Sequence, residues 1–575
     1  MIDSLPPGVL LIVGALVFPA LRGRVQQAWL VLLPVASFLH LLSLGDGTVR
    51  QLELFDYTLT PVRVDALSLV WGYVFHLAAF LSAIYALHVK DRWQHTAAMT
   101  YAGSAIGGVF AGDLITLFIY WELTAITSVF LIWARPDHLQ GRARDEQIER
   151  SYHAGMRYLL IQVGSGVILL AGIILRVRSG GSLEFSHLGL VDVATGLIFI
   201  AFGIKAAFPL LHSWLEDAYP EATVTGTVFL SAFTTKMAIY ALARGFAGTE
   251  ILIYIGAAMT AFPIFFAVIV NDLRRVLTYS LNNQLGFMVC GVGLGTEMAL
   301  NGTAAHAFAH ILYKALLFMS MGAVLYRTGT AKGSELGGLY KSMPWTTGFC
   351  IVGAASISAF PLTSGFISKS LVLSSAAKEH YVLVYLVLLF ASAGVFHHSG
   401  IKIPYFAFFA HDSGRRVKEA PLHMLIAMGG AAALCLGIGI FPGALYSILP
   451  FTVDYEPYTA SHVVTQLQLL IFSALAFTVL NLKGLYPPEQ RSVVLDFDWT
   501  YRKALPRAMG ALARAGGSLQ TWVEGAITGA LTNTQHSLAR LYGPRGIFAR
   551  NWTTGSIALR AALMLGGYLL FYLFY

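Results

Sequence analysis

The sequence predicts an all-α polytopic membrane protein with about sixteen transmembrane helices. Of its 575 residues, 56% are hydrophobic and only 12% are charged, about half of the roughly 25% that soluble domains carry. Apolar runs of roughly 17–25 residues follow one another, and each is long enough to cross a bilayer core of roughly 30 Å. No polar linker interrupts them before residue 484. A secreted, disordered, collagenous or disulfide-framed protein is thereby excluded.

The apolar runs give the expected positions of the spans. The first run follows MIDSLPPG, which contains an acid and no Lys or Arg, so it lacks the basic flank of a cleavable signal peptide. We therefore expect a retained first span. In chain order the runs lie near 6–21, 27–45, 66–88, 95–112, 113–133, 152–175, 190–214, 221–243, 251–270, 277–296, 303–326, 346–372, 380–401, 422–446, 464–482 and 556–575.

Basic residues in the loops predict the orientation, because Lys and Arg in short loops stay on the cytoplasmic side. With the N-terminus external (periplasmic), the odd-numbered loops are cytoplasmic. These loops contain Arg22, Arg24, Lys90, Arg92, Arg135, Arg142, Arg144, Arg150, Arg274, Arg275, Arg327, Lys332, Lys341, Arg415, Arg416 and Lys418. The even-numbered loops contain fewer, namely Arg50, Arg63, Arg176, Arg178, Arg244 and Lys378. One miscounted span would destroy this alternation.

The segment 484–554 differs from the rest of the chain. Between 501 and 554 it has seven Lys or Arg and one acid, Glu524, and so carries most of the net charge of +8. Leu505, Met509, Leu512 and Leu519 recur among them at roughly helical spacing. This pattern favours a basic amphipathic helix on the cytoplasmic membrane face or along a partner subunit, followed by a final span at 555–575. The alternative is a plain cytoplasmic linker; the interleaved apolar residues argue against nucleic-acid binding.

Cysteine usage and motifs predict no cofactor and no metal site in this chain. Cys290, Cys350 and Cys435 lie far apart in apolar runs with no CxxC, so iron–sulfur, c-haem and structural zinc sites are not expected. No phosphate-binding loop of the GxxxxGK type and no Rossmann glycine motif occurs. Any redox chemistry would have to come from partners.

Ionisable residues lie inside predicted spans, where each costs at least ~2.5–3.5 kcal/mol. They are Glu122, Lys205, Lys236, Lys314, Lys369 and Lys402. A single one could snorkel or form a structural ion pair, and snorkelling suits Lys402, which is near a span end. The set exceeds what one structural ion pair would use. A line of such groups is what proton transport requires, because a buried lysine can release its proton and a nearby Glu122 would hold it charged.

His306, His310 and Lys314 are spaced at i, i+4 and i+8, which places them on one face of a helix about 6 Å apart along its axis. With bridging water they would form a proton relay. A lone buried histidine would more often be a satisfied core residue, but the alignment of three favours function.

Two predicted spans are interrupted. KAAFPLLHSWLEDAYPEA has Pro209 and His212 after Lys205, and SAFPLTSGFISK has Pro361 and Gly365 before Lys369. Interrupted spans at corresponding positions of two halves indicate a transport site. These are spans seven and twelve, so we expect two inverted five-helix repeats, spans 4–8 and 9–13. The expected parts are N-terminal helices (1–94), the repeats (95–245 and 246–401), C-terminal core helices (402–483), the basic segment (484–554) and the last helix (555–575).

These motifs resemble the antiporter-like subunits of respiratory complex I, membrane-bound hydrogenases and multisubunit Mrp cation/proton antiporters. The resemblance covers roughly 60–410 and includes VFLSAFTTKMAIYALARGF, DLRRVLTYSLNNQLGFM and HAFAHILYKALLFM. It implies a core of fourteen helices in a bacterial inner membrane. It also implies that Glu122 is the family's essential glutamate, Lys205 the lysine of the broken span, Lys236 the bridging lysine and Lys369 the terminal lysine. His306, His310 and Lys314 would lie on the central span.

Within the family, a lysine at 236 and a lysine at 369 look most like the D subunit of Mrp antiporters, and the complex I subunit nearest the peripheral arm shares that pattern. Two features depart from it. Glu216 stands where most members have proline, and the tail 484–575 is longer than that of a typical D subunit. In placement, the tail resembles the lateral helix and last span of the largest complex I paralogue.

We therefore expect a proton-translocating subunit of a monovalent cation/proton (Na+/H+) antiporter. Glu122 would modulate Lys205, protons would pass along Lys236 and the His306/His310/Lys314 line, and Lys369 would release them at the opposite face, driven by about 2.3 kcal/mol per charge per 100 mV. The alternatives are a pump in a redox complex and a membrane subunit for inorganic-carbon uptake. The expected partners are other membrane subunits, protons, Na+ or K+, and the bilayer.

Overall fold

The computed structural model describes residues 5–134, 141–490, 494, 496–542 and 554–574. The chain divides into two compact units, Met1–Val494 and Leu495–Tyr575. Within the described residues, eleven helices are long and apolar enough to cross a membrane, and two further apolar helices are shorter. The predicted all-α polytopic membrane fold is confirmed.

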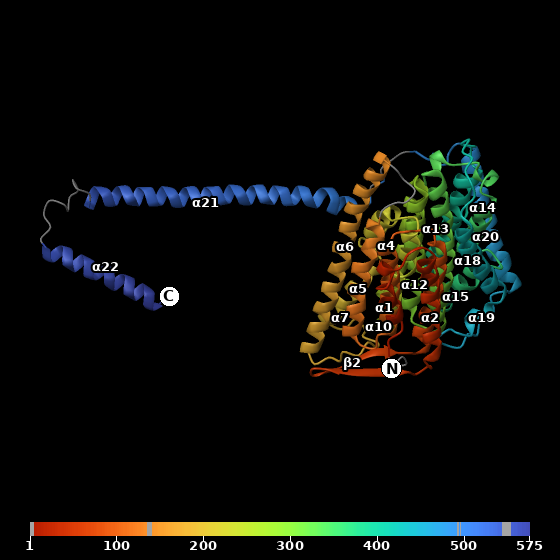
Figure 1. Ribbon diagram of the computed structural model, residues 1–575, viewed down its shortest axis with the longest axis horizontal. Helices are drawn as coiled ribbons and strands as arrows, with labels where there is room; N and C mark the ends of the chain where they lie inside the picture. Colours follow the sequence, from red (N-terminus) through yellow and green to blue (C-terminus); the bar gives the residue numbers. More distant parts are fainter. Residues whose placement is uncertain (1–4, 135–140, 491–493, 495, 543–553, 575) are drawn as a thin grey trace. The chain divides into compact units, whose positions relative to one another are not determined.

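In the first unit the helices form one bundle (Figure 1). Those of its first half are α1 (Val9–Ala15) with the 3₁₀ turn η2 (Phe18–Ala20), α2 (Gly23–Ser43), α3 (Ala66–Tyr85), α4 (Arg92–Phe110), α5 (Leu114–Trp133), α6 (Gly141–Arg178), α7 (Val193–Lys205) with α8 (Ser213–Ala218) and η3 (Tyr219–Glu221), and α9 (Gly226–Ala232) with α10 (Thr234–Gly245). They follow the order of the expected spans one to eight.

The second half continues in the order of expected spans nine to fifteen. Its elements are α11 (Ile251–Ile269), α12 (Leu273–Leu294), α13 (Glu297–Thr328), the turns η4 (Gly333–Glu335) and η5 (Leu339–Lys341), α14 (Pro344–Ile357) with α15 (Ser364–Lys378), α16 (Val382–Val395) with η6 (Phe396–Ile401), α17 (Lys402–Pro404) and η7 (Tyr405–Phe409), α18 (Leu422–Ile440), α19 (Pro442–Tyr446) and α20 (Ala460–Leu482). Both η6 and η7 are π-helical turns.

Short polar side chains set where many of these helices begin. An Asp or Thr at the N-cap accepts a hydrogen bond from a backbone N–H of the first turn, which would otherwise be unpaired. This occurs at Asp65, Asp91, Asp113, Asp192, Asp272, Thr296 and Thr459. Seven of the sixteen predicted spans therefore begin at a residue whose side chain caps the helix.

The loop between α2 and α3 contains a β-hairpin that the sequence analysis did not predict. Strands β1 (Val49–Leu54) and β2 (Tyr57–Arg63) pair antiparallel, with Leu54 opposite Tyr57. The hairpin is fixed to the start of α5, because the Thr60 N–H donates to Asp113 Oδ2 at 2.7 Å. It lies at one end of the bundle (Figure 1).

The centre of the bundle is α13, which is buried on all faces between Asn301 and Val324. It packs against α12, α14, α15 and α18 of the second half and against α3 and α9 of the first. A helix covered on every side is the interior helix of a bundle. This position puts the predicted His306/His310/Lys314 face away from lipid.

The two interrupted spans share the same break. Ala-Phe-Pro-Leu occurs at 207–210 and again at 359–362, with left-handed backbone at the Ala and the Leu of each copy: φ is 62° and 70° in the first, and 57° and 69° in the second. The Phe N–H bonds five residues back in both, to Gly203 O and to Ala355 O, each at 3.0 Å. Equal breaks in spans seven and twelve fit the inverted five-helix repeats.

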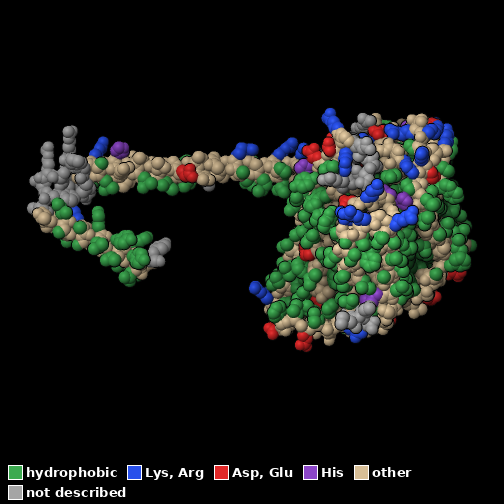
Figure 2. Space-filling view, viewed as in Figure 1, with side chains coloured by type: hydrophobic (Ala, Val, Ile, Leu, Met, Phe, Trp, Pro, Cys, Tyr) green, Lys and Arg blue, Asp and Glu red, His purple; other side chains and the backbone are tan. Residues whose placement is uncertain are grey.

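The first unit has a hydrophobic belt, and Lys and Arg gather mainly at the end away from the hairpin (Figure 2). That end carries the loops that the sequence analysis predicts to be cytoplasmic. An external N-terminus remains a prediction.

The second unit contains the π-helical turn η8 (Thr500–Ala504), α21 (Leu505–Tyr542) and α22 (Thr554–Phe574). Helix α21 carries Lys and Arg on one side and hydrophobic residues on the other (Figure 2). Leu505, Met509 and Trp522 are exposed on it. A basic amphipathic helix therefore occupies the position that the sequence analysis assigned to one.

Candidate functional site

Lys205 of α7 bonds to α5, the helix that carries Glu122. Lys205 is the last residue of α7 and is fully buried. Its Nζ donates to Thr124 Oγ1 at 2.8 Å and to the Trp121 carbonyl, and it lies 4.4 Å from the centre of the Trp121 ring. The Glu122 carboxylate acts electrostatically on this amine. The amine is thus bonded to Trp121 and Thr124, on the helix that carries Glu122, and interacts with the acid through its charge.

Gly166 on α6 makes room for the Glu122 carboxylate. A Cβ at position 166 would lie 1.3 Å from Glu122 Oε1. The same oxygen is buried and has no hydrogen-bond partner among the described residues. Next to this glycine, Ser165 accepts a bond from Trp121 Nε1 at 3.0 Å, which fixes the neighbouring side chain of α5. Helix α6 therefore positions the acid by leaving space rather than by bonding it.

Lys236, His310 and Lys314 are fully buried between α10 and α13. Lys236 Nζ donates to the Ser231 carbonyl at 2.5 Å, at the point where span eight divides into α9 and α10. The charge of Lys236 acts on both His310 and Lys314. Among the described residues, neither ring nitrogen of His310 nor Lys314 Nζ has a hydrogen-bond partner. Buried polar groups of this kind usually bind ordered water.

His306 continues this group toward α12 and α15. Its ring centre is 6.2 Å from that of His310, and its Nδ1 is 3.2 Å from Ser368 Oγ on α15. Its Nε2 is 3.5 Å from the Tyr313 hydroxyl, which donates to Gln284 Oε1 on α12 at 2.9 Å. Sequence reasoning missed both Tyr313 and Gln284, because neither is charged.

Lys369 is buried near the start of α15, and its Nζ donates to the carbonyl of Ile357, the last residue of α14, at 3.1 Å. Its charge acts on His306 and His310. The lysine also lines a cavity of about 150 Å³. The other polar side chains around that cavity come from α15, α16 and α20, namely Ser370, Ser374, Tyr385, His462, Thr465 and Gln466.

Lys402 does not snorkel, although it lies near a span end. It is fully buried, and its Nζ bonds the carbonyls of Val268 and Val270 at 2.6 and 2.8 Å, at the end of α11. Glu489 Oε1 lies 2.7 Å from the same atom. The sequence analysis did not identify Glu489, because an acid in a polar loop is expected to be exposed to solvent.

His398 connects Lys402 to the other buried lysines. The charges of Lys314, Lys402 and Lys369 all act on its ring. Its Nδ1 is 2.9 Å from Ser399 Oγ, which donates to Ser280 Oγ on α12 at 2.7 Å. The signal in the sequence that could have indicated it is the adjacent pair His397–His398 just before Lys402.

The predicted residues thus form two groups. Glu122 and Lys205 make up the first, and the second extends from Lys236 through the residues of α13 to Lys369 and Lys402. Within the described residues, no hydrogen bond, ion pair or charge interaction joins Lys205 to Lys236. A proton moving between the groups would need water or a movement of side chains.

The residues of the breaks have structural positions. Pro209 and Pro361 occupy equivalent places in the two Ala-Phe-Pro-Leu copies. His212 is buried with its ring centre 4.6 Å from that of Phe262 on α11, so it touches the other repeat. Gly365 lets α15 approach α14, because a Cβ there would lie 1.8 Å from the Ser356 carbonyl oxygen.

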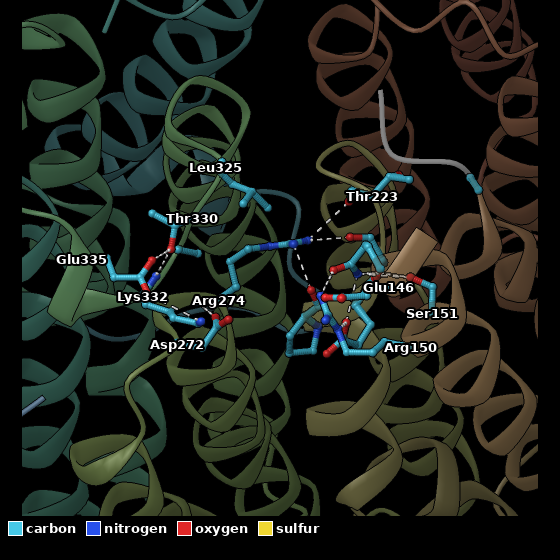
Figure 3. A pocket seen from close by; sticks show the side chains of 17 residues that line it. Glu146, Arg150, Ser151, Thr223, Asp272, Arg274, Leu325, Thr330, Lys332 and Glu335 are labelled. Carbon is cyan, nitrogen blue, oxygen red and sulfur yellow. Dashed lines mark hydrogen bonds and ion pairs between the residues drawn. The ribbon is translucent and has the colours of Figure 1, made fainter. Parts of the chain in front are cut away.

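A polar hollow of about 400 Å³ lies at the end of the bundle away from the hairpin and is lined by both repeats (Figure 3). Arg274, at the start of α12, reaches across to the carbonyls of Pro220 and Ala222 at 2.9 and 3.0 Å. On the other wall, Ser151 of α6 donates to the Glu221 carbonyl at 2.8 Å. None of the eight predicted relay residues is among its lining residues, and its buried arginine holds the repeats together.

Within the described part of the chain, no group of three or more His, Cys, Asp or Glu is placed to hold a metal ion. The three cysteines are free and buried.

Residues 111–396 match the family described as the transmembrane domain of NADH:quinone oxidoreductases and Mrp antiporters. The matched residues make up just under half of the chain, and over this stretch the chain is similar to that family. The match includes both broken spans and all the predicted relay residues except Lys402. The family resemblance stated from the five motifs is therefore confirmed.

Three curated relatives come from different kinds of complex. Hydrogenase-4 component B of Escherichia coli is 26% identical over 67% of this chain and 63% of its own length. The D subunit of the Na+/H+ antiporter of Alkalihalophilus pseudofirmus is 28% identical, over 60% of this chain and 72% of the relative. The N subunit of the NADH-quinone oxidoreductase of Desulforudis audaxviator is 33% identical, over 46% and 54%. The chain thus spans less than two thirds of two of these relatives.

Two solved structures share the fold of this antiporter-like subunit at 20% identity. A chain of the Mrp complex from Dietzia sp. aligns with a TM-score of 0.68 and covers 83% of this chain, with 99% of its own length matched. A chain of the archaeal membrane-bound sulfane sulfur reductase aligns with a TM-score of 0.70 over 99% of this chain and 100% of its own. Both belong to multisubunit membrane complexes.

Proposed function

We propose that this antiporter-like subunit moves protons across the membrane along its buried lysines and histidines. The observation that carries the proposal is the second group: Lys236, His306, His310, Lys314 and Lys369 interact electrostatically inside a bundle whose helices are apolar outside. Burying so many ionisable groups is unfavourable for a purely structural core. Protons, which these groups can bind and release, are the substrate that this chemistry fits.

In this proposal Glu122 controls the charge of Lys205. When the carboxylate faces the amine, the ammonium form is favoured, and when they separate, the amine can give up its proton. The unpartnered Oε1 of Glu122 and the space provided by Gly166 leave the carboxylate able to move. Transfer from Lys205 to Lys236 would require water between the two groups.

From Lys236 the proton would pass along α13. His310 and Lys314, which have no protein partner among the described residues, would bind the connecting water. Lys369 would then release the proton into the cavity between α15, α16 and α20. Lys402, His212, Pro209, Pro361 and Gly365 complete the proposed site, the last four as parts of the breaks.

We further propose that the complex is a monovalent cation/proton antiporter in a bacterial inner membrane, with this chain in the role of the D subunit. The similarity to the D subunit of a Na+/H+ antiporter and the lysines at 236 and 369 support this assignment. The other subunits, the bilayer, and Na+ or K+ would be its partners.

A proton pump in a redox complex is the second candidate, and one observation favours it. The sulfane sulfur reductase chain covers 99% of this chain, whereas the Mrp chain covers 83%. A fold match that continues through α21 and α22 thus occurs in a respiratory complex. Electron transfer would belong to partner subunits.

The complex purified through a tag on this chain tests both candidates. Copurifying small antiporter subunits would support the first, and flavin or nickel–iron subunits the second. In membrane vesicles, addition of Na+ or K+ should dissipate an imposed pH gradient, and Lys369→Met should slow this by about 100-fold or more, the scale of a lost proton carrier. Lys378→Met, at the exposed end of the same helix, is the matched control. Normal exchange in Lys369→Met would refute the relay.

A further inference from the structure

The ion pair between Lys402 and Glu489 is buried on both sides. The two side chains are 0% and 5% exposed, and Nζ lies 2.7 Å from Oε1. Glu489 follows α20 in the segment 484–490, which precedes the second unit by only a few residues. A chain segment that follows α20 thus supplies an acid to a buried lysine at the end of the second repeat.

The segment 484–490 is held against the bundle by Tyr486. Its ring is 7% exposed and packs on Phe406 of η7, with ring centres 6.1 Å apart, on Phe477 of α20 at 5.1 Å and on His397 of η6 at 5.4 Å. The anchor lies three residues before Glu489. It fixes the point at which the acid enters the bundle.

A purely structural ion pair would be arranged differently. Buried charges stabilise a fold only when their remaining hydrogen-bonding positions are satisfied. Lys402 is satisfied by carbonyls at the end of α11, but Glu489 Oε2 is buried and has no hydrogen-bond partner among the described residues. That oxygen faces Gly333, whose Cβ, if present, would lie 3.4 Å from it. Only one of the two carboxylate oxygens of Glu489, Oε1, is therefore paired with Lys402.

The lysine side of the pair leads into the relay. Lys402 lies between two π-helical turns, η6 and η7, and such turns occur frequently at functional sites. His398, four residues before it, is acted on by the charges of Lys402, Lys314 and Lys369. A line of buried titratable groups therefore runs from Glu489 to the centre of the bundle.

The first repeat has a comparable arrangement. There Glu122 interacts with Lys205 and also keeps one buried oxygen without a hydrogen-bond partner among the described residues. Each half thus contains a buried lysine with an acid supplied by another segment, α5 in one case and 484–490 in the other. Glu489 has no position in the repeats themselves.

We propose that Glu489 is a proton-exchanging residue that serves the buried lysines and histidines of the second repeat, at the predicted cytoplasmic end of the bundle. In the step, the Glu489 carboxyl transfers its proton to the neutral Lys402 amine, which gives carboxylate and ammonium. Lys402 then passes the proton to His398 Nε2, which is buried and has no hydrogen-bond partner among the described residues, and Glu489 takes up a new proton on Oε2 from the predicted cytoplasmic side. This inference rests on the proposed function, because it extends the same proton line.

The environment of the acid fits such a step. Burial raises the pKa of the Glu489 carboxyl above its usual value, and the positive charge of Lys402 opposes this only in part. The titratable groups around the pair are His397 and His398 of η6 and Tyr486 of the same segment. The carbonyls of α11 add only partial charge at Lys402.

Point variants in the native complex test the proposal, with proton translocation in membrane vesicles as the readout and the melting temperature of the purified complex as the check on folding. Glu489→Gln should lower the rate by about 100-fold, and Glu489→Asp should restore much of it. The double variant Glu489→Gln/Lys402→Met should be no slower than Lys402→Met alone. Glu456→Gln, an exposed acid before α20, is the matched control and should translocate normally.

A structural pair would behave otherwise. Wild-type rates in Glu489→Gln, or a loss of rate in proportion to the loss of folded complex, would overturn the proposal. If the single variants fail to assemble, the double variant decides, because it buries no charge at this place. A double variant that assembles but does not translocate protons supports the proposal. A double variant that assembles and translocates at the normal rate, or that does not assemble, overturns it.

Glu122→Gln, measured in parallel, separates this inference from the proposed function. If Glu122→Gln is inactive while Glu489→Gln is normal, only the inference fails. If the wild-type complex moves no protons, the proposed function fails.

Discussion

The Glu122 carboxylate fits against α6 because residue 166 is a glycine and has no side chain. Because Gly166 leaves the space that Oε1 occupies, Gly166→Ala must displace the carboxylate or the helix. We expect this variant to lose proton translocation almost as fully as Glu122→Gln while the complex still assembles. Gly164→Ala, on the same helix, should retain the wild-type rate in vesicles, because a Cβ added there has nothing within 4 Å. Equal rates in the two alanine variants would contradict the positioning role of Gly166.

Asp65 gives a pH prediction outside the spans. Burial acts to raise the pKa of its carboxyl, but the charge and hydrogen bond of Arg244 and the Ser68 N–H hold this pKa below its usual value. An acid of this kind adds stability above its unfolded pKa, roughly 3.9, and loses it as the pH falls through the lower folded-state value. Asp65→Asn should therefore lower the melting temperature clearly at pH 7 and much less at pH 3.

Asp46→Asn, which changes an exposed acid of the same loop, is the control for general acid effects. A melting-temperature difference for Asp65→Asn that stays constant from pH 7 to pH 3 would contradict the assigned interaction with Arg244.

For single residues, the sequence predicts a functional role where a charged side chain lies among apolar neighbours in the chain. Glu122, Lys205, Lys236 and Lys314 are recognisable because each lies in the middle of an apolar run. Glu489 lies in a polar segment, and its burial depends on Tyr486 packing against residues about 80 to 90 positions earlier. No local pattern contains that contact.

At the level of the helices, the Ala-Phe-Pro-Leu breaks of spans seven and twelve lead to a prediction about stability. Leu362 has φ 69° and is 54% exposed, so its side chain contributes little packing and its backbone is strained. Leu362→Ile should lower the free energy of unfolding by about 1–2 kcal/mol, because a branched Cβ is least tolerated in the left-handed region. Leu362→Asn should be tolerated. The measurement is chemical unfolding in detergent.

Leu383→Ile is the matched control, since Leu383 is exposed in the regular helix α16. The corresponding change at Leu210, with φ 70°, should repeat the result in the first repeat. If Leu362→Ile and Leu383→Ile are equally stable, the backbone of the break is not strained as described.

The elements also show where reading the sequence fails. Long apolar runs and capping residues locate the spans because each depends on neighbours in the chain. The hairpin was missed because a hydropathy window averages over the alternation in Tyr57–Arg63. The π-helical turns around Lys402 consist of i→i+5 backbone bonds, which a hydropathy pattern does not distinguish from those of an α-helix.

For the whole molecule, two truncations separate the tail from the segment 484–490. A chain ending at Val494 keeps the Lys402–Glu489 pair and loses the second unit, whereas one ending at Lys483 loses both. We expect the longer form to give less assembled complex but a normal proton rate per complex. The shorter form should lose the rate as well. Equal rates per assembled complex in the two forms would contradict a role for Glu489.

The orientation in the membrane can be tested with the three natural cysteines in place, since all are buried. Phe55→Cys, at the exposed tip of the hairpin, should react with a membrane-impermeant thiol reagent from outside the cell. Gly414→Cys, in the loop before α18, should react only after the membrane is opened. The reverse labelling would invert the predicted topology.

The repeated Ala-Phe-Pro-Leu turn has a consequence for the history of the chain. The two predicted five-helix repeats, with the same strained backbone at the same place, are what duplication of one ancestral gene would leave. Because five helices are an odd number, the duplicated unit had to fold after insertion in either direction.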